Sequence, residues 1–167
     1  MTPTPQQIDP RGPRFTASVT LVLLAVVLVT PRPVSIALLA IQTVAFLIGA
    51  VRGVQHTPTA FVFRRFVRPR LAAPDHLEDS RPPRFAQAVG LGFAVVALAG
   101  FASGQTLVGA IATGFALIAA FLNAVFGFCL GCELYLLIRR VSPARQPESH
   151  QNNTITDQPI NKKEAIA

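Results

Sequence analysis

Long runs of apolar residues without a single Asp, Glu, Lys or Arg are the dominant pattern of this chain. Four such runs occur, over residues 15–30, 34–51, 85–101 and 107–132. The first three contain 16, 18 and 17 residues, close to the roughly 20 that a helix needs to cross a hydrocarbon core about 30 Å thick. Each of them therefore predicts one membrane-spanning helix, completed at its ends by interfacial residues.

The fourth run, with 26 residues, is too long for one simple span. Gly127 and Gly131 lie where the excess begins, and glycine is a frequent point of helix interruption. We therefore predict a span over residues 107–126 and a second helical piece over 129–140. Between the first two runs stands only the tripeptide "PRP", which predicts a tight hairpin. The pattern as a whole predicts an all-α membrane protein with four transmembrane helices in two tandem helical hairpins.

An internal repeat supports this arrangement. Residues 9–53 align without a gap on residues 79–123, at an offset of 70, with 15 of 45 positions identical. The charged segment "DPRGPRF" at the start of the first copy recurs as "DSRPPRF" in the second. Chance similarity between apolar segments does not explain a match of charged residues and prolines. Each copy enters the membrane from the same side, so we expect two hairpins of the same topology, a parallel repeat.

The register continues beyond the hairpins, so that the full repeats span residues 9–70 and 79–140. We expect each hairpin to be followed by a short interfacial helix, over 58–70 and 129–140. In the first of these, a helical arrangement gathers arginines on one face and phenylalanines on the other, which suits headgroups and acyl chains. The second copy carries cysteines where the first carries arginines. We therefore predict that the first of these helices has only a structural role and that the second carries specialised chemistry.

Composition and charge fit a protein that lives in lipid. The chain has 51% hydrophobic and only 14% charged residues, which excludes an ordinary soluble domain. Twelve of the thirteen arginines fall outside the "PRP" hairpin, before the first span, between the second and third, or after the fourth. Basic loops stay in the cytoplasm, so both termini and the cysteines are expected there. The net charge of +7 needs no nucleic acid partner, because basic loops beside an anionic bilayer explain it.

The domain organisation follows from these boundaries. We expect a cytoplasmic N-terminal segment over residues 1–14 and a single four-span membrane domain over 15–142. The remaining residues, 143–167, are polar and lack periodicity, which predicts a disordered cytoplasmic tail.

Candidate chemistry is concentrated in the stretch "FGFCLGCE", which holds both cysteines of the chain, Cys129 and Cys132. Three interpretations remain open. The thiols are buried packing groups, or half of a metal site to which His56 is the nearest candidate third ligand, or a redox or sulfur-handling dithiol. No cofactor is identified by the sequence.

The dithiol interpretation assigns the two cysteines different roles. Cys129 is expected to begin a helix, where unsatisfied backbone N–H groups stabilise a thiolate, while Cys132 lies one turn later. Cys129 is therefore the predicted attacking thiol, and Cys132 the thiol that resolves a mixed disulfide. The carboxylate of Glu133 acts in the opposite direction, because a nearby negative charge disfavours the thiolate.

The sequence also resembles a known family, the bacterial integral-membrane family catalogued as domain of unknown function 4395. The resemblance covers about residues 8–141 and rests on the strings "IDPRGPRF", "RPRLAAPDHLEDSRPPRFAQAVG" and "FLNAVFGFCLGCELYLL". It implies a four-span protein of the bacterial cytoplasmic membrane with a C-L-G-C motif. It also implies an association with thioredoxin-like and sulfurtransferase proteins.

Two classes of function follow. The first is a membrane-embedded dithiol protein that exchanges electrons or sulfur with a cytoplasmic thioredoxin-like or sulfurtransferase partner through Cys129 and Cys132. The alternative is a small membrane transporter, or a scaffold without catalytic chemistry. A chain of this size is too small for a monomeric pore, so transport requires a homodimer or a larger oligomer.

Overall fold

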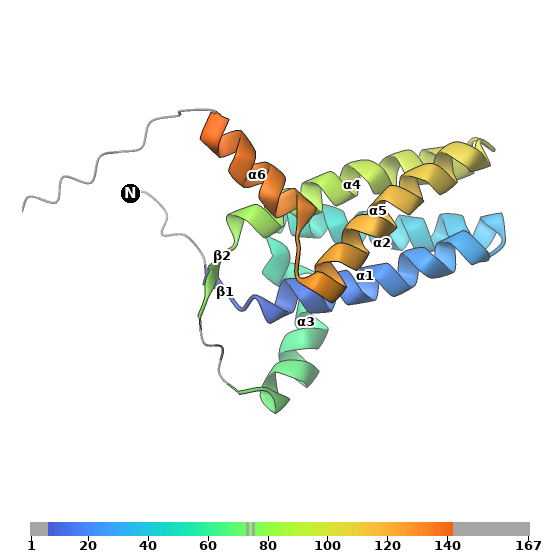
Figure 1. The fold of residues 1–167 in the computed structure, drawn as a ribbon. Helices are drawn as coiled ribbons and strands as arrows, with labels where there is room; N and C mark the ends of the chain where they lie inside the picture. The colour runs from blue at the N-terminus through green and yellow to red at the C-terminus, as the bar shows by residue number, and fades with distance from the viewer. Residues whose placement is uncertain (1–6, 73, 75, 142–167) are drawn as a thin grey trace, which may run out of the picture.

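The computed structural model describes residues 7–72, 74 and 76–141 as a helical bundle with a small strand pair at one end (Figure 1). The predicted tail over 143–167 and the first six residues of the predicted N-terminal segment lie outside this part of the chain. In chain order the elements are β1 (Gln7–Ile8), α1 (Arg11–Val29), α2 (Arg32–Arg52), η1 (Val54–His56), α3 (Pro58–Val62), η2 (Phe63–Val67), η3 (Arg68–Arg70), β2 (Glu78–Asp79), α4 (Arg81–Ala102), α5 (Thr106–Phe126) and α6 (Leu130–Val141).

Four of these helices, α1, α2, α4 and α5, are long and apolar enough to cross a membrane, as the apolar runs predict. α1 begins at Arg11, four residues before the first apolar run, because the interfacial "RGPR" already belongs to the helix. The helices meet in a small apolar core, whose buried members are Leu24, Val27, Leu39, Ala97, Phe101 and Ala112. Large apolar side chains cover the outer surface instead, as in Val22 (64% exposed) and Ile41 (62% exposed), which suits lipid as the surrounding medium.

The two ends of the bundle differ. At one end lie the short α1–α2 and α4–α5 turns, and at the other lie both strands, α3 and α6 (Figure 1). Across the bundle, α2 packs most closely against α4, and α1 packs against α5. Each half of the chain therefore packs against the other.

Arginine side chains donate hydrogen bonds to the last carbonyls of the facing helix where α2 packs against α4. Arg32, at the start of α2, donates from Nε to the Phe101 carbonyl (2.7 Å) and from Nη2 to the Ala102 carbonyl (2.9 Å). At the opposite end, Arg84 donates in the same way to the carbonyls of Ala50 and Val51, both at 2.7 Å. The last carbonyls of a helix have no partner within it, so these guanidinium groups satisfy them. The one arginine of the "PRP" turn thus holds the start of α2 against the end of α4, in the other half of the chain.

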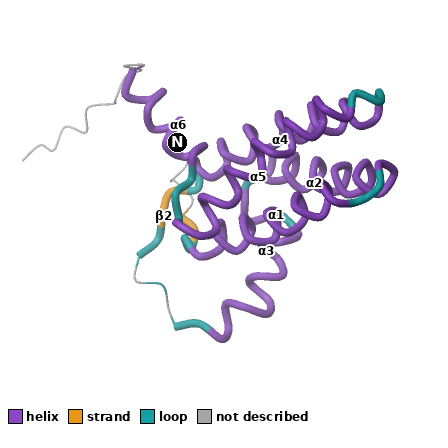
Figure 2. Tube along the Cα trace, turned by 45° about the vertical axis from the view of Figure 1, so that its right-hand side comes forward, coloured by secondary structure: helices purple, strands orange, loops and turns teal. Residues whose placement is uncertain are grey.

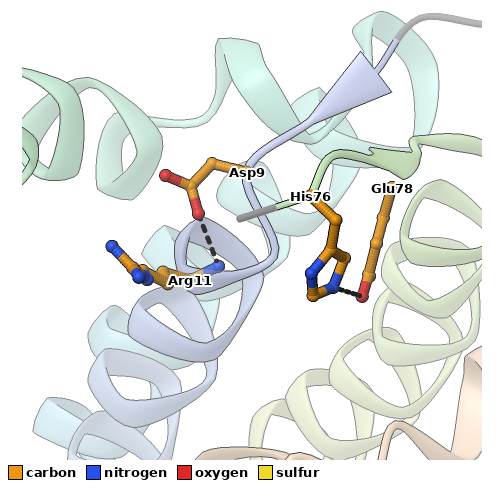
Figure 3. A network of polar contacts seen from close by, with 4 residues as sticks. All are labelled: Asp9, Arg11, His76 and Glu78. Carbon is orange, nitrogen blue, oxygen red and sulfur yellow. Dashed lines mark hydrogen bonds and ion pairs between the residues drawn. The ribbon is translucent and has the colours of Figure 1, made fainter. Parts of the chain in front are cut away.

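The beginnings of α1 and α4 show the same local structure, 70 positions apart. Asp9 Oδ1 accepts the Arg11 N–H at 3.0 Å (Figure 3), and Asp79 Oδ1 accepts the Arg81 N–H at 2.9 Å. The strands β1 and β2, which the sequence analysis did not predict, pair antiparallel. Ile8 stands opposite Glu78 in this pair, and these residues are themselves 70 positions apart.

The second long helices of the two halves, α2 and α5, are not related by the offset of 70 that the gap-free alignment gives. α2 and α5 begin at Arg32 and Thr106, and their C-caps are Gly53 and Gly127, so both ends are offset by 74. The four extra residues come from α4, which has 22 residues against 19 in α1, and from a turn longer by one. Four residues are about one helical turn, so the shift keeps the apolar face in place and leaves little trace in the sequence.

Candidate functional site

The cysteines lie directly after a sharp stop of α5. Gly127 adopts a left-handed conformation with φ of 69°. Its N–H donates to the Asn123 carbonyl (3.1 Å), which is the bond of an αL cap, and the Phe128 N–H donates to the Leu122 carbonyl (3.2 Å). Glycine takes this conformation without steric cost. The cap ends the span and turns the chain into α6, as the sequence predicts for this glycine.

Cys129 is the residue that caps the N-terminus of α6. Its sulfur accepts the backbone N–H of Cys132 at 3.4 Å, and its carbonyl accepts the Glu133 N–H at 3.0 Å. The same arrangement occurs in the first half, where the Thr57 hydroxyl accepts the Ala60 N–H at 3.2 Å at the start of α3. Thr57 and Cys129 are 72 positions apart, so the cysteine replaces a hydroxyl cap. The gap-free alignment pairs Cys129 with Thr59 instead, two positions away.

The surroundings of the two sulfurs separate their acidities. Hydrogen bonds from the Cys132 thiol and from the N–H groups of Cys132 and Gly131 lower the pKa of Cys129 to about 7, against the opposing effects of burial and Glu133. The pKa of Cys132 is raised, chiefly because its thiol donates to Cys129 and because it is partly buried. The predicted effect of Glu133 is therefore real but does not dominate. Cys129 is the thiol that ionises first.

Gly131, inside the C-L-G-C motif, sets how closely α6 approaches α4. A Cβ atom at this position would lie 2.7 Å from both Cα and Cβ of Ala86. Any side chain would therefore push the start of α6 away from α4. One turn further along α6, Tyr135 packs on Phe85 of α4, with ring centroids 5.7 Å apart. The glycine and the ring pair together fix the helix that carries the cysteines.

The strand pair also lies at this end of the bundle, close to the start of α6 (Figure 2). The negative charge of Glu78, on β2, contributes to the raised pKa of Cys132. His76 Nε2 lies 3.5 Å from Glu78 Oε1 (Figure 3), in an exposed pair. The sequence pattern gave no signal that Glu78 would influence Cys132.

The structure does not assemble the alternative metal site. No group of three or more His, Cys, Asp and Glu side chains that could hold a metal ion occurs among residues 7–72, 74 and 76–141. His56, the candidate third ligand, lies in η1 of the first half, and it does not join Cys129 and Cys132 in such a group. Both cysteines are free and half-buried.

Comparison with known proteins adds a family but no activity. The family model described as "Domain of unknown function (DUF4395)" matches residues 8–140, which is most of the chain. No curated protein matches the sequence, and no solved structure does.

Proposed function

The chain belongs to the DUF4395 family, and we propose from its geometry that it is a membrane-embedded dithiol protein acting in thiol-disulfide exchange or sulfur handling. The observation that carries this proposal is the asymmetry of the two sulfurs. A thiol with a pKa near the ambient pH is the best attacking group in exchange reactions, and Cys129 has a pKa of about 7. Cys132 stays protonated beside it.

The exchange follows from these two states. The Cys129 thiolate attacks one sulfur of a partner disulfide, so that a mixed disulfide forms and the partner's other sulfur leaves as a thiolate. Cys132 then loses its proton and attacks the Cys129 sulfur, which releases the partner's second thiolate and forms a Cys129–Cys132 disulfide. Two electrons pass from the dithiol to the partner. The reverse sequence reduces the dithiol again.

The site leaves room for a protein partner. Phe128 and Leu130, on either side of Cys129, are 45% and 43% exposed. These apolar side chains offer a contact surface around the attacking sulfur. The family resemblance suggests a thioredoxin-like or sulfurtransferase protein as the partner. The site lies at the arginine-rich end of the bundle, which we assign to the cytoplasmic face of the bacterial inner membrane because basic segments stay inside.

Trapping of the mixed disulfide tests this proposal. In membranes of the parent bacterium, Cys132→Ser should accumulate a disulfide-linked adduct through Cys129, because the resolving thiol is missing. Cys129→Ser, the matched control with one thiol at the other position, should accumulate none. An adduct in the Cys129→Ser variant alone would reverse the roles. If neither variant forms an adduct under conditions that oxidise cytoplasmic thiols, the redox proposal is wrong.

A further inference from the structure

A cavity of about 300 Å³ opens at the same end of the bundle, beneath the helical segment that follows α2. That volume lies at the lower end of the range for ligand pockets. The cavity is lined by β1, by the first two turns of α1, by η1, α3, η2 and η3, by α4 and by Leu77, which precedes β2. None of its lining residues is a cysteine, so it is separate from the proposed dithiol site.

Two arginines line this cavity, and both are available to a ligand. The guanidinium groups of Arg64 and Arg68 form no hydrogen bond or ion pair with any residue that the structure describes. Asp9 is the one carboxylate among the lining residues, and one of its oxygens already accepts the Arg11 N–H. The lining therefore carries a net positive charge, which favours an anion.

The local helical geometry determines which of the neighbouring arginines line the cavity. Phe63–Val67 is a π-helical turn, in which the Arg68 N–H bonds to the Phe63 carbonyl. Such turns are rare in proteins, and those that occur often lie at functional sites. Arg65, inside the same turn, does not line the cavity. The sequence analysis treated all these arginines alike, as a general contact with headgroups.

The remaining lining residues indicate the kind of anion. Polar groups that can bind hydroxyls come from two glutamines and one threonine, Gln7, Gln87 and Thr16, and the Thr16 hydroxyl also contacts the Thr59 hydroxyl. Apolar side chains complete the wall, with Phe63 buried to 4% exposure. Guanidinium groups bind phosphate oxygens in a planar, paired geometry. A phosphate ester with a hydroxylated, partly apolar carrier combines all of these features.

We propose that this cavity binds a phosphate ester through Arg64 and Arg68, either as the headgroup of a glycerophospholipid or as a small soluble phosphate. The second half of the chain has no equivalent pair. At the offset of 72 that relates the two caps, the counterparts of these arginines are Leu136 and Arg140. One half would thus hold an anion, and the other the thiols.

Binding to the purified full-length protein in an uncharged detergent tests this site. The probes are dihexanoyl phosphatidylglycerol, glycerol 3-phosphate and, as a zwitterionic comparison, dihexanoyl phosphatidylcholine, each followed by ³¹P NMR line broadening. At least one of the anionic probes should bind saturably. Binding of the lipid alone identifies a headgroup site, and equal binding of glycerol 3-phosphate identifies a soluble ester.

Matched variants separate a built site from general surface charge. Arg64→Gln and Arg68→Gln should each weaken binding on the order of tenfold, because each removes charge-assisted hydrogen bonds. Arg65→Gln, with the same change in net charge, should keep the affinity within about twofold. The proposal is overturned if no anionic probe binds saturably, or if Arg65→Gln weakens binding as much as Arg64→Gln. Circular dichroism of each variant verifies that the helices are intact.

Discussion

The backbone N–H of Cys132 points at the sulfur of Cys129, 3.4 Å away. This contact makes the first cysteine of the motif both a helix cap and a stabilised thiolate. It explains why the two cysteines stand three positions apart, because the third residue after an N-cap is one whose N–H the cap can accept. Structure and reactivity thus depend on the same bond.

The first prediction concerns the pH dependence of Cys129. Its lowered pKa means that the thiolate persists to lower pH, so alkylation in the Cys132→Ser variant should rise with a midpoint near 7, because serine retains the donors. In Cys132→Ala the side-chain donor is lost, and the midpoint should move upward. At pH 7 the alanine variant should then react several-fold more slowly. Equal midpoints at 8.5 or above in both variants would contradict the account.

Gly131→Ala should displace α6 from α4. The added methyl group meets Ala86 at 2.7 Å, and we expect a loss of about 1–3 kcal/mol in unfolding free energy, as is typical of overpacking. Thermal unfolding in detergent measures this change. The control is Gly92→Ala in α4, where nothing lies within 4 Å of the added atom and where alanine favours the helix. A smaller effect at Gly131 than at Gly92 would show that the close approach is unimportant.

Removing the Arg84 clamp should loosen the contact between the end of α2 and the start of α4. Arg84→Ala leaves two carbonyls without their donors, which costs about 1–3 kcal/mol in unfolding free energy. Arg84→Lys should restore only part of this, because lysine lacks the planar fork. Arg70→Ala, an exposed arginine without a partner among the described residues, serves as the control. Equal stability of the Arg84 and Arg70 variants would exclude the clamp.

The proposed orientation can be measured with thiol reagents that do not cross membranes. If the arginine-rich end faces the cytoplasm, as we propose, Cys129 should be labelled in inside-out vesicles and protected in intact spheroplasts. A cysteine placed at the exposed Ser103, in the turn at the opposite end, should show the reverse pattern once both native cysteines are changed to serine. Labelling of Cys129 from outside would refute the orientation.

The spans were predictable from sequence because a membrane imposes a simple requirement on length and composition. Gly127 was equally informative, since a glycine at the end of an apolar run commonly marks a helix stop. The strand pair was not predictable, because two residues on each side carry no periodic signal. The four-residue shift between α2 and α5 was missed because one helical turn preserves the same apolar face.

The candidate site was only partly predictable for a similar reason. The spacing of Cys129 and Cys132 is local, so it indicated a helix cap and a dithiol. The contact between Gly131 and Ala86 and the influence of Glu78 join residues about 45 or more positions apart. The glycine of the C-L-G-C motif was the available signal for the first of these. For the second, no local pattern exists.

Differential alkylation of native membranes, followed by mass spectrometry of the peptide that holds both cysteines, tests the central claim most directly. Membranes from oxidised cells should yield a fraction of this peptide with an internal Cys129–Cys132 disulfide. Treatment with a reductant before alkylation should convert that fraction to the doubly alkylated form. A peptide that is doubly alkylated under every condition would contradict a cycling dithiol and leave the cysteines with a structural role.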